Sequence, residues 1–518
     1  MPIWQAKMTK RTSSVQQSAF AERGLAGTIN ALSAEIRELY LSDSVPWVLG
    51  YSGGKDSTAT LQLVWYALSE LTEQERTKPV YVISTDTLVE NPVVAAWVAS
   101  SLEQMQVVAA ETGMPFVPQR LTPVVSNTFW VNLIGKGYPA PRPKFRWCTE
   151  RLKIRPSNDF ITNVVRDRGE VILVLGIRKQ ESAARARAMD RHERMRVRDR
   201  LSPNANLPNS LIYSPVEDWS DDDIWTYLMQ VSNPWGYRNQ DLLTLYQGAS
   251  PDGECPLVVD DSTPSCGDSR FGCWVCTMVE QDKSMAAMIQ NDQEKEWMLP
   301  MLQLRNELDV KDDRHMRDFR RMNGAVQIFH GRTIPGPYTQ EWRAHWLRRV
   351  LEVQTWIRQH GPEAMSEISL ISNEELEEIR RIWVVDKHEI EDLLPSIYEA
   401  ATQQSYKGER LDDDACFTAS DLALLKAACG DDPVRYETLR GLLEVERRHK
   451  VSARRAGLFD ALEKTLRRGL HSDEAAALQF VLPYHEARQR VADEAQHTID
   501  VVDVTEELTP RPSNLFAS

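Results

Sequence analysis

The feature that most constrains this chain is the segment Ser-Gly-Gly-Lys-Asp-Ser at positions 52–57. It follows a short apolar run, residues 47–51, that predicts a buried strand, and it precedes residues 58–71, whose pattern predicts a helix. A glycine turn between a strand and a helix N-terminus lets backbone N–H groups approach an anion closely. The segment therefore predicts a phosphate-binding loop, although it lacks the first glycine of the G-x-x-x-x-G-K-S/T motif. The alternative, a plain glycine turn capped by Ser57, is disfavoured by the flanking strand and helix.

Strand and helix patterns alternate along the first half of the chain. Apolar runs at 79–84 and 171–175 predict further buried strands, and apolar residues at helical spacing cover 21–43 and about 92–112. This alternation predicts an α/β fold with a parallel sheet and crossover helices. Ligands of such sheets bind at the carboxyl ends of the strands, where this chain places its glycine loop. Beyond residue 278 the strand signals fade, so we expect a largely α-helical C-terminal half.

A chain of 518 residues is too long for one hydrophobic core, which predicts several domains. We expect an N-terminal extension (1–20), an α/β nucleotide-binding domain (21–245), a cysteine-rich segment (246–280), a helical domain (281–497) and a tail (498–518). No apolar run reaches the length of a membrane span, and no secretory signal is recognised at the start. Clustered cysteines without a leader predict a cytoplasmic protein and no membrane partner.

Four of the seven cysteines crowd one short stretch of the chain. Cys273 and Cys276 have the two-residue spacing that lets both thiolates reach one metal centre. Cys266 precedes them, Cys255 is a further nearby thiol, and Cys148 follows a basic stretch earlier in the chain. Three or four thiolates without clustered histidines favour zinc or an iron–sulfur centre. A redox dithiol is the alternative.

Basic residues gather locally in a chain whose formal charge is −14. Residues 178–200 hold nine Lys or Arg and four Asp or Glu. Together with Lys136, Arg142, Lys144 and Arg146, they could line a path for a phosphodiester backbone. The alternative is a helix face with Arg–Glu ion pairs along it.

The SGGKDS segment resembles the signature of the PP-loop ATP pyrophosphatases, the adenine nucleotide α-hydrolase-like group. Three further segments match the phosphoadenylylsulfate reductase branch of that group in family order: STDT at 84–87, CTERLK at 148–153 and GIRKQESAAR at 176–185. The resemblance implies that the loop grips the β,γ-pyrophosphate of ATP while the α-phosphorus is attacked. It also implies Mg²⁺ bridging the phosphates.

The cysteine-rich segment makes the resemblance more specific, because it matches one family within this group. SCGDSRFGCWVCT at 265–277 and PGPYTQEWR at 335–343 resemble the DndC family, the ATP pyrophosphatase and iron–sulfur component of DNA phosphorothioate modification. The likeness runs over about residues 20–490. It implies a 4Fe–4S cluster on Cys148, Cys266, Cys273 and Cys276, with Cys255 a weaker candidate. The chain also departs from the reductase branch, because it has no adjacent Cys-Cys pair and no thiol after Cys429.

These features together predict an ATP-dependent sulfurtransferase that forms AMP and pyrophosphate to activate the DNA backbone for sulfur insertion. The predicted ATP-binding residues are Ser52, Gly53, Gly54, Lys55, Asp56, Ser57 and Asp86, and the predicted catalytic residues are Lys55, Asp56, Arg178 and Arg185. The resemblance implies DNA, a cysteine desulfurase as sulfur donor, and DndD- and DndE-like subunits as partners, with the cluster holding or relaying the sulfur. The alternatives are a sulfonucleotide reductase, a tRNA thiolation enzyme and, in another class, a nucleotide-sensing scaffold subunit.

Overall fold

A computed structural model describes residues 18–250, 271–408, 419–450 and 454–483 together with Ala487, apart from Val197, Asp199 and Ala205. Residues 1–17, the predicted tail at 498–518, Cys255 and Cys266 lie outside the described residues. The chain divides into two compact units. We call them the α/β unit, within 1–129, 141–309 and 356–370, and the helical unit, within 130–140, 310–355 and 371–518.

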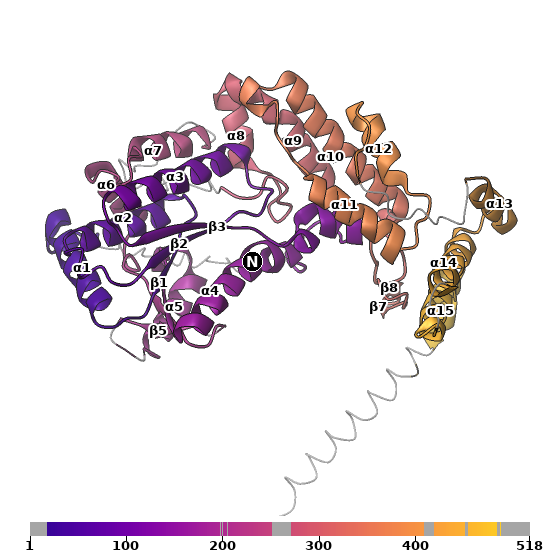
Figure 1. Cartoon of the computed structure of the whole chain (residues 1–518), viewed down its shortest axis with the longest axis horizontal. Helices are drawn as coiled ribbons and strands as arrows, with labels where there is room; N and C mark the ends of the chain where they lie inside the picture. Colours follow the sequence, from indigo (N-terminus) through magenta and orange to yellow (C-terminus); the bar gives the residue numbers. More distant parts are fainter. Residues whose placement is uncertain are drawn as a thin grey trace, which may run out of the picture. The chain divides into compact units, whose positions relative to one another are not determined.

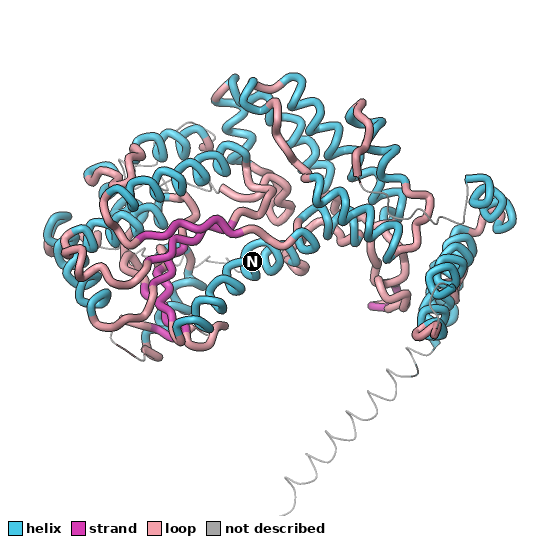
Figure 2. The backbone as a smooth tube through the Cα atoms, in the orientation of Figure 1, coloured by secondary structure: helices cyan, strands magenta, loops and turns pink. Residues whose placement is uncertain are grey.

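The α/β unit is built on a six-stranded sheet of order β3-β2-β1-β4-β6-β5, shown as the magenta segments at its centre in Figure 2. The strands are β1 (Trp47–Gly50), β2 (Val80–Thr85), β3 (Phe116–Leu121), β4 (Val171–Val174), β5 (Ser202–Pro203) and β6 (Ser210–Tyr213). All neighbouring strands are parallel except β5, which pairs antiparallel with β6. The predicted parallel α/β fold is therefore confirmed.

Helices cover both faces of this sheet, because successive strand residues point to opposite faces. Trp47 and Leu49 of β1 pack into a large core with helices α1, α2, α3, α6 and α7, whereas Val48 packs into a smaller core with α4. These helices are α1 (Gly24–Leu41), α2 (Lys55–Ser69), α3 (Pro92–Glu111), α4 (Arg155–Arg168), α6 (Asp221–Gln230) and α7 (Asn239–Gly248), most of them labelled in Figure 1. The unit also holds α5 (Ala183–Glu193), α8 (Lys283–Asn291) and α9 (Leu299–Leu308).

Helix α3 alone among the described helices is long and apolar enough to cross a membrane by length and composition. It is, however, the crossover helix between β2 and β3, and it packs Leu102, Met105 and Ala109 into the larger core. Its apolar character therefore has an explanation within the fold.

Three strands of the sheet, β3, β5 and β6, were not predicted from the sequence. β3 lies at an edge of the sheet and carries Pro118, a residue that an edge strand tolerates because one side of it needs no ladder hydrogen bond. Its mixed polarity gives no continuous apolar run, since an edge strand is covered less completely than a central one.

The helical unit confirms the predicted helical C-terminal half. It contains most of α10 (Gln340–His360), then α11 (Asn373–Arg381), α12 (Leu393–Thr402), α13 (Ala419–Cys429), α14 (Pro433–Lys450) and α15 (Leu458–Arg468), with a small hairpin of β7 (Ile328–Phe329) and β8 (Arg332–Thr333). Helices α14 and α15 approach closely at Gly441, where an added Cβ would lie 2.9 Å from Thr465 Cγ2.

One segment of the helical unit comes from the middle of the α/β sequence. Residues 130–140 contain the π-helix η2 (Val131–Lys136), which packs with α11 and the π-helix η8 (Ile382–Asp386). Trp383 Nε1 donates a hydrogen bond to the Ile134 carbonyl oxygen at 3.0 Å, and the Tyr338 N–H donates to the Gly137 carbonyl at 2.7 Å. The side chains of Val131, Leu133 and Ile134 are completely buried.

Candidate functional site: a phosphate loop and a group of thiols

The SGGKDS segment lies where the sheet order reverses. From β1 the chain proceeds to β2 and β3 on one side, whereas β4 and β6 lie on the other side. Ligands of open α/β sheets bind at this switch point, outside the carboxyl ends of the strands. The segment joins the end of β1 to the start of α2, with Gly54 as the residue that caps the helix. The predicted strand–loop–helix arrangement is therefore confirmed.

Two glycines make this turn possible. Gly53 has φ +73°, and a Cβ added there would lie 2.4 Å from Val98 Cγ2 on α3. Gly176, just after β4, would bring a Cβ to 2.7 Å from the Asp56 carbonyl oxygen. Gly53 therefore permits both the left-handed conformation and the close packing of the loop, and Gly176 lets the end of β4 approach the first turn of α2.

The two serines of the segment bond to each other and to the loop backbone. Ser57 Oγ accepts a hydrogen bond from the Ser52 N–H at 3.2 Å and donates one to the Gly54 carbonyl at 3.1 Å. The hydroxyl oxygens of Ser52 and Ser57 lie 3.1 Å apart. These bonds hold the loop in one conformation, which is what a preorganised anion site requires.

Four charged side chains form a network beside the loop. Lys55 Nζ lies 3.2 Å from Asp221 Oδ1 and 3.4 Å from Asp56 Oδ2. Arg178 Nε lies 2.6 Å from Asp56 Oδ1, and its Nη2 pairs with Asp221. Arg178 also donates to the Trp219 carbonyl and has a side chain only 3% exposed. Two cations and two carboxylates thus alternate around a site that is largely removed from water.

The pKa shifts in this network follow from burial and from the opposite charges. Burial acts to lower the pKa of Lys55 and of Arg178, but the carboxylates of Asp56 and Asp221 outweigh it and raise both. Burial likewise acts to raise the pKa of Asp221, but the charges of Lys55 and Arg178 lower it overall. Both cations are therefore held charged, ready to bind an anion.

Two members of this site were missed by the sequence-based predictions. Asp221 is the first residue of α6, which begins with a capping box between Ser220 and Asp223. That box is visible in the sequence and marks a helix start, but it does not reveal that Asp221 meets Lys55. Tyr246 on α7 accepts a hydrogen bond from the Lys55 N–H at 3.3 Å, and its ring lies under the Lys55 ammonium.

Two predicted residues do not join this network through the contacts observed among the described residues. Arg185 lies on α5, where its Nη2 is 3.3 Å from Glu181 and its side chain is 41% exposed. Asp86, at the end of β2, pairs with Arg120 and accepts a hydrogen bond from the Leu88 N–H at 2.7 Å. Their predicted roles in catalysis and ATP binding stay predictions.

The thiols gather at the same edge of the sheet, after β2. Cys273 pairs in an antiparallel bridge with Glu90, and its Sγ lies 3.3 Å from Thr87 Oγ1. Burial, then the charge of Glu90, raises the pKa of the Cys273 thiol to about 12. Burial also raises the pKa of the Cys148 thiol, and the neighbouring Cys276 raises it further. The fold therefore brings together three of the four predicted cluster ligands.

Thiolates are the donor type that iron–sulfur clusters use. No three His, Cys, Asp or Glu side chains in the described ranges are placed to hold one metal ion. A cluster differs, because its cysteine ligands bind different iron atoms. Lys153 lies beside these thiols, with its Nζ 3.4 Å from Glu90 Oε1. Burial acts to lower the pKa of Lys153, but the charges of Cys273 and Glu90 raise it, so a cation faces the thiols.

The basic segment 178–200 is largely neutralised by ion pairs. Six of its nine cations pair with carboxylates: Arg178, Lys179, Arg185, Arg196, Arg198 and Arg200. Lys179, for example, contacts Glu193 at 2.6 Å and Asp218 at 2.9 Å. Only the Arg185–Glu181 pair has the helical spacing of the Arg–Glu alternative, and most of the other pairs join the segment to carboxylates elsewhere in the chain. The predicted nucleic-acid path stays a prediction.

A glycine loop at the switch point of a mostly parallel sheet, with paired cations beside it, is the arrangement of an anion-binding α/β domain. Residues 46–278 match the phosphoadenosine phosphosulfate reductase domain family. This part, which is less than half of the chain, is therefore similar to that family, and the match ends just after the cysteine pair at 273 and 276.

Known proteins resemble the chain only in part. An uncharacterized protein of Methanocaldococcus jannaschii is 26% identical over 245 residues, which cover 47% of this chain and 39% of that protein. The U34-tRNA thiolase NcsA of Methanococcus maripaludis, solved with its 4Fe–4S cluster, aligns with 14% identity and a TM-score of 0.27 over 65% of this chain and 89% of the thiolase. The FMN adenylyltransferase of Candida glabrata, solved with FAD and inorganic pyrophosphate, aligns with 11% identity and a TM-score of 0.26, covering 43% and 61%. TM-scores this low support no conclusion about fold or chemistry.

Proposed function

We propose that the chain is an ATP-dependent sulfurtransferase that cleaves ATP to AMP and pyrophosphate and activates a DNA phosphodiester for sulfur insertion. The observation that carries the proposal is the joint placement of the phosphate loop and three thiols at the carboxyl edge of one sheet. The loop follows β1, and Thr87 and Glu90, which contact Cys273, follow the neighbouring parallel strand β2. A site for nucleotide activation and a site for sulfur chemistry therefore adjoin the same edge.

The loop residues would act on the leaving pyrophosphate. Lys55 and Arg178 are held charged, and the turn at Gly53 and Gly54 presents backbone donors to an anion. As the α-phosphorus is attacked, negative charge builds on the leaving pyrophosphate, and fixed donors stabilise that charge without reorganising. Asp56 offers the oxygen ligand type that Mg²⁺ takes, and Mg²⁺ would neutralise phosphate charge.

The second half of the reaction would replace AMP by sulfur. A non-bridging oxygen of the DNA phosphodiester would attack the α-phosphorus and expel pyrophosphate, and a sulfide-level nucleophile would then attack the backbone phosphorus and expel AMP. Cys148, Cys273 and Cys276 would hold an iron–sulfur cluster, which would supply a binding place for sulfur. Thr87, Trp274 and Val275 beside Cys273 are buried, which limits the access of water to this place.

The choice of DNA as acceptor rests on the resemblance of the cysteine-rich segment to the DndC family. The absence of an adjacent Cys-Cys pair and of a thiol beyond Cys429 argues against sulfonucleotide reduction. The predicted partners, a cysteine desulfurase with DndD- and DndE-like subunits, belong to the same proposal.

Pyrophosphate release tests the loop chemistry. Anaerobically purified protein with ATP and Mg²⁺ should form pyrophosphate and AMP in equal amounts, and Asp56→Asn should abolish release. Asp167→Asn is the matched control, because its carboxylate is 65% exposed and pairs only at 3.5 Å with Arg166. Release of ADP and phosphate instead, or full activity of Asp56→Asn, would remove the loop from the proposed chemistry.

Mass spectrometry of nucleic-acid digests tests the acceptor. Cells that carry the protein should contain sulfur-bearing dinucleotides in their DNA, and Cys276→Ala should remove them. Thiolated nucleosides in tRNA that disappear in Cys276→Ala, with unmodified DNA, would transfer the proposal to tRNA thiolation. Retained pyrophosphate release without sulfur in either nucleic acid would contradict the sulfurtransferase assignment.

A further inference from the structure

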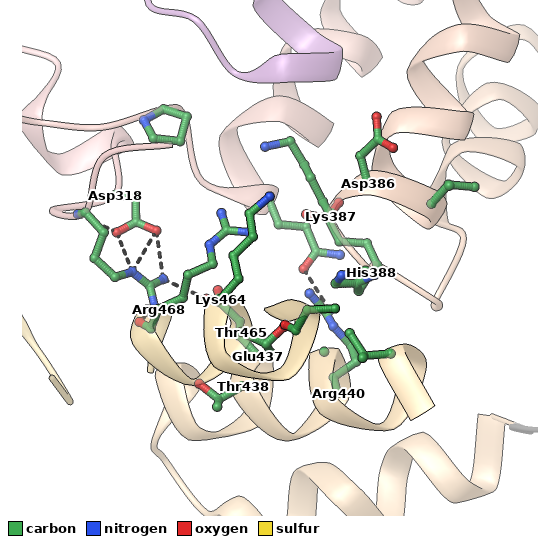
Figure 3. A pocket seen from close by; sticks show the side chains of 18 of the residues that line it. Asp318, Asp386, Lys387, His388, Glu437, Thr438, Arg440, Lys464, Thr465 and Arg468 are labelled. Carbon is green, nitrogen blue, oxygen red and sulfur yellow. Dashed lines mark hydrogen bonds and ion pairs between the residues drawn. The ribbon is translucent and has the colours of Figure 1, made fainter. Parts of the chain in front are cut away.

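A cavity of about 430 Å³ lies within the helical unit, apart from the phosphate loop and the thiols. It is enclosed by the segment around Tyr338, by the loop that follows η8, and by helices α14 and α15. Figure 3 shows Lys387 and His388 from that loop, together with Lys464 and Arg468 from α15, around the same space. Its volume lies within the range of small-molecule pockets.

The lining of this cavity is strongly charged and has more cations than anions. Seven Lys or Arg residues line it: Arg320, Arg343, Lys387, Arg440, Arg448, Lys464 and Arg468. Only four Asp or Glu residues do so: Asp318, Asp386, Glu389 and Glu437. Two histidines, His388 and His449, complete the charged and titratable set.

All four acids already have arginine partners. Asp318 and Glu437 each lie 2.7 Å from Arg320, Glu389 pairs with Arg343, and Asp386 lies 3.1 Å from Arg381 outside the lining. Two further lining arginines of α14 also have acidic partners: Arg440 pairs with Glu391 in the loop before α12, and Arg448 pairs with Glu444 on the same helix. These pairs leave no lining carboxylate for the remaining cations.

Three cations therefore face the cavity uncompensated. Within the described residues, the side chains of Lys387, Lys464 and Arg468 form no ion pair or hydrogen bond. Burial, then the positive charge of Arg343, lowers the pKa of Lys387 to about 7 despite Glu389. Burial also lowers the pKa of Arg468. At both cations, burial and a neighbouring arginine outweigh the nearby carboxylates, which are paired with other arginines.

Two buried polar atoms also point to a missing partner. His388 Nδ1 and Arg440 Nε have no hydrogen-bond partner in the described structure, although both are buried. Buried polar groups are normally satisfied by protein, water or ligand. Burial lowers the pKa of His388 to about 4, so its neutral ring can donate or accept a hydrogen bond near pH 7.

We propose that this cavity, here called the basic pocket, binds a small molecule with two or more phosphoryl groups, such as pyrophosphate or a nucleoside diphosphate. Three uncompensated cations match the charge of such a group better than that of a monocarboxylate. The volume exceeds what a single phosphate ion needs. This proposal does not depend on the proposed function of the phosphate loop.

Isothermal titration with pyrophosphate tests the basic pocket in full-length protein. Lys55→Ala removes the phosphate-loop cation from the background, and this variant should still bind one equivalent. Adding Lys387→Met or Arg468→Met should weaken that binding at least about tenfold, since each removes a charge from a desolvated site. Lys426→Met is the matched control, because Lys426 is exposed on α13, and it should leave binding unchanged.

The outcomes distinguish ligand sources. Binding of ADP that depends on Lys387 and is displaced by pyrophosphate would support a nucleotide, whereas pyrophosphate binding without ADP binding would support the inorganic anion. Failure of the Lys55→Ala protein to bind either ligand would overturn the proposal, as would binding unaffected by both pocket variants. Lys387-dependent binding of duplex DNA, without pyrophosphate binding, would also overturn it and assign the site to nucleic acid. If Arg468→Met fails to fold, Lys464→Met at the exposed rim takes its place.

Discussion

The phosphate loop requires glycine at position 53 for two reasons, the left-handed backbone conformation and the close packing against α3. Alanine substitutions at three glycines of the α/β unit measure these two effects separately. Gly169 has φ +86° with nothing within 4 Å of an added Cβ, so Gly169→Ala measures the left-handed conformation alone. Gly176 has ordinary φ, but its added Cβ would lie 2.7 Å from a backbone oxygen, so Gly176→Ala measures crowding alone. Gly53 combines φ +73° with a 2.4 Å approach to Val98.

The magnitudes follow from these geometries. The left-handed conformation costs an alanine about 1 kcal/mol, and crowding in a packed region costs about 1–3 kcal/mol. Gly169→Ala should therefore lose about 1 kcal/mol of unfolding free energy, Gly176→Ala about 1–3 kcal/mol, and Gly53→Ala about 2–4 kcal/mol as the sum. Val98 is β-branched and stiff, so it gives way poorly.

Hydrogen exchange measures the loss of unfolding free energy in the α/β unit itself. The slowest amides of β1, residues 47–50, report the unfolding free energy of the α/β unit, and mass spectrometry of a peptide across β1 gives it for each variant. Gly176→Ala should also weaken ATP binding, because its Cβ displaces the turn that carries Asp56. A Gly53→Ala protein no less stable than Gly169→Ala would refute the steric argument, and unchanged ATP affinity in Gly176→Ala would show that Asp56 keeps its place.

Three further predictions concern charge and thiol chemistry. Asp221→Asn removes a carboxylate that competes with the ligand for Lys55 and Arg178. Calorimetry should therefore show tighter pyrophosphate binding at the loop. Weaker binding would mean that Asp221 itself contacts the ligand or its metal. Because the pKa of Lys387 is lowered to about 7, the unfolded chain binds more protons than the folded chain between pH 7 and about 10.4, so stability should rise with pH in that window. Lys387→Met should flatten this rise in denaturant titrations, and an unchanged slope would contradict the assignment. In metal-free protein at pH 8, the alkylation of Cys273 should be about a thousandfold slower than in the unfolded chain, because the pKa of its thiol is raised to about 12. Peptide mapping measures both rates, and equal rates would contradict the burial of Cys273.

The central part of the fold could be predicted from the sequence because buried parallel strands are almost continuously apolar. Residues 47–50 and 171–174 show this pattern, and both are confirmed as β1 and β4. The edge strand β3 escaped prediction because most of its residues are only partly buried or exposed and because it includes Pro118. Local pattern thus sufficed where burial was complete and failed where it was partial.

Only the parts of the site that are contiguous in sequence could be predicted. The loop and the Cys273–Cys276 pair are contiguous in sequence, so their chemistry is visible without a fold. Asp221 and Tyr246 reach Lys55 only through the packing of α6 and α7 beside α2, which no local spacing encodes. The basic pocket escaped for the same reason, since its cations come from five separate segments: around Arg320, α10, the loop after η8, α14 and α15.

Residues 130–140 belong to the helical unit, although their sequence lies between two parts of the α/β unit. This arrangement affects how the chain folds during synthesis and where it can be truncated. During synthesis this segment emerges long before Tyr338 and Trp383, the residues that later bond to it. Until then the side chains of Val131, Leu133 and Ile134, buried in the finished protein, have no cover. A fragment ending after the cysteine pair would keep them uncovered permanently, which exposes apolar surface to aggregation. Expression of the intact chain keeps this segment together with Tyr338 and Trp383, the residues that bond to it.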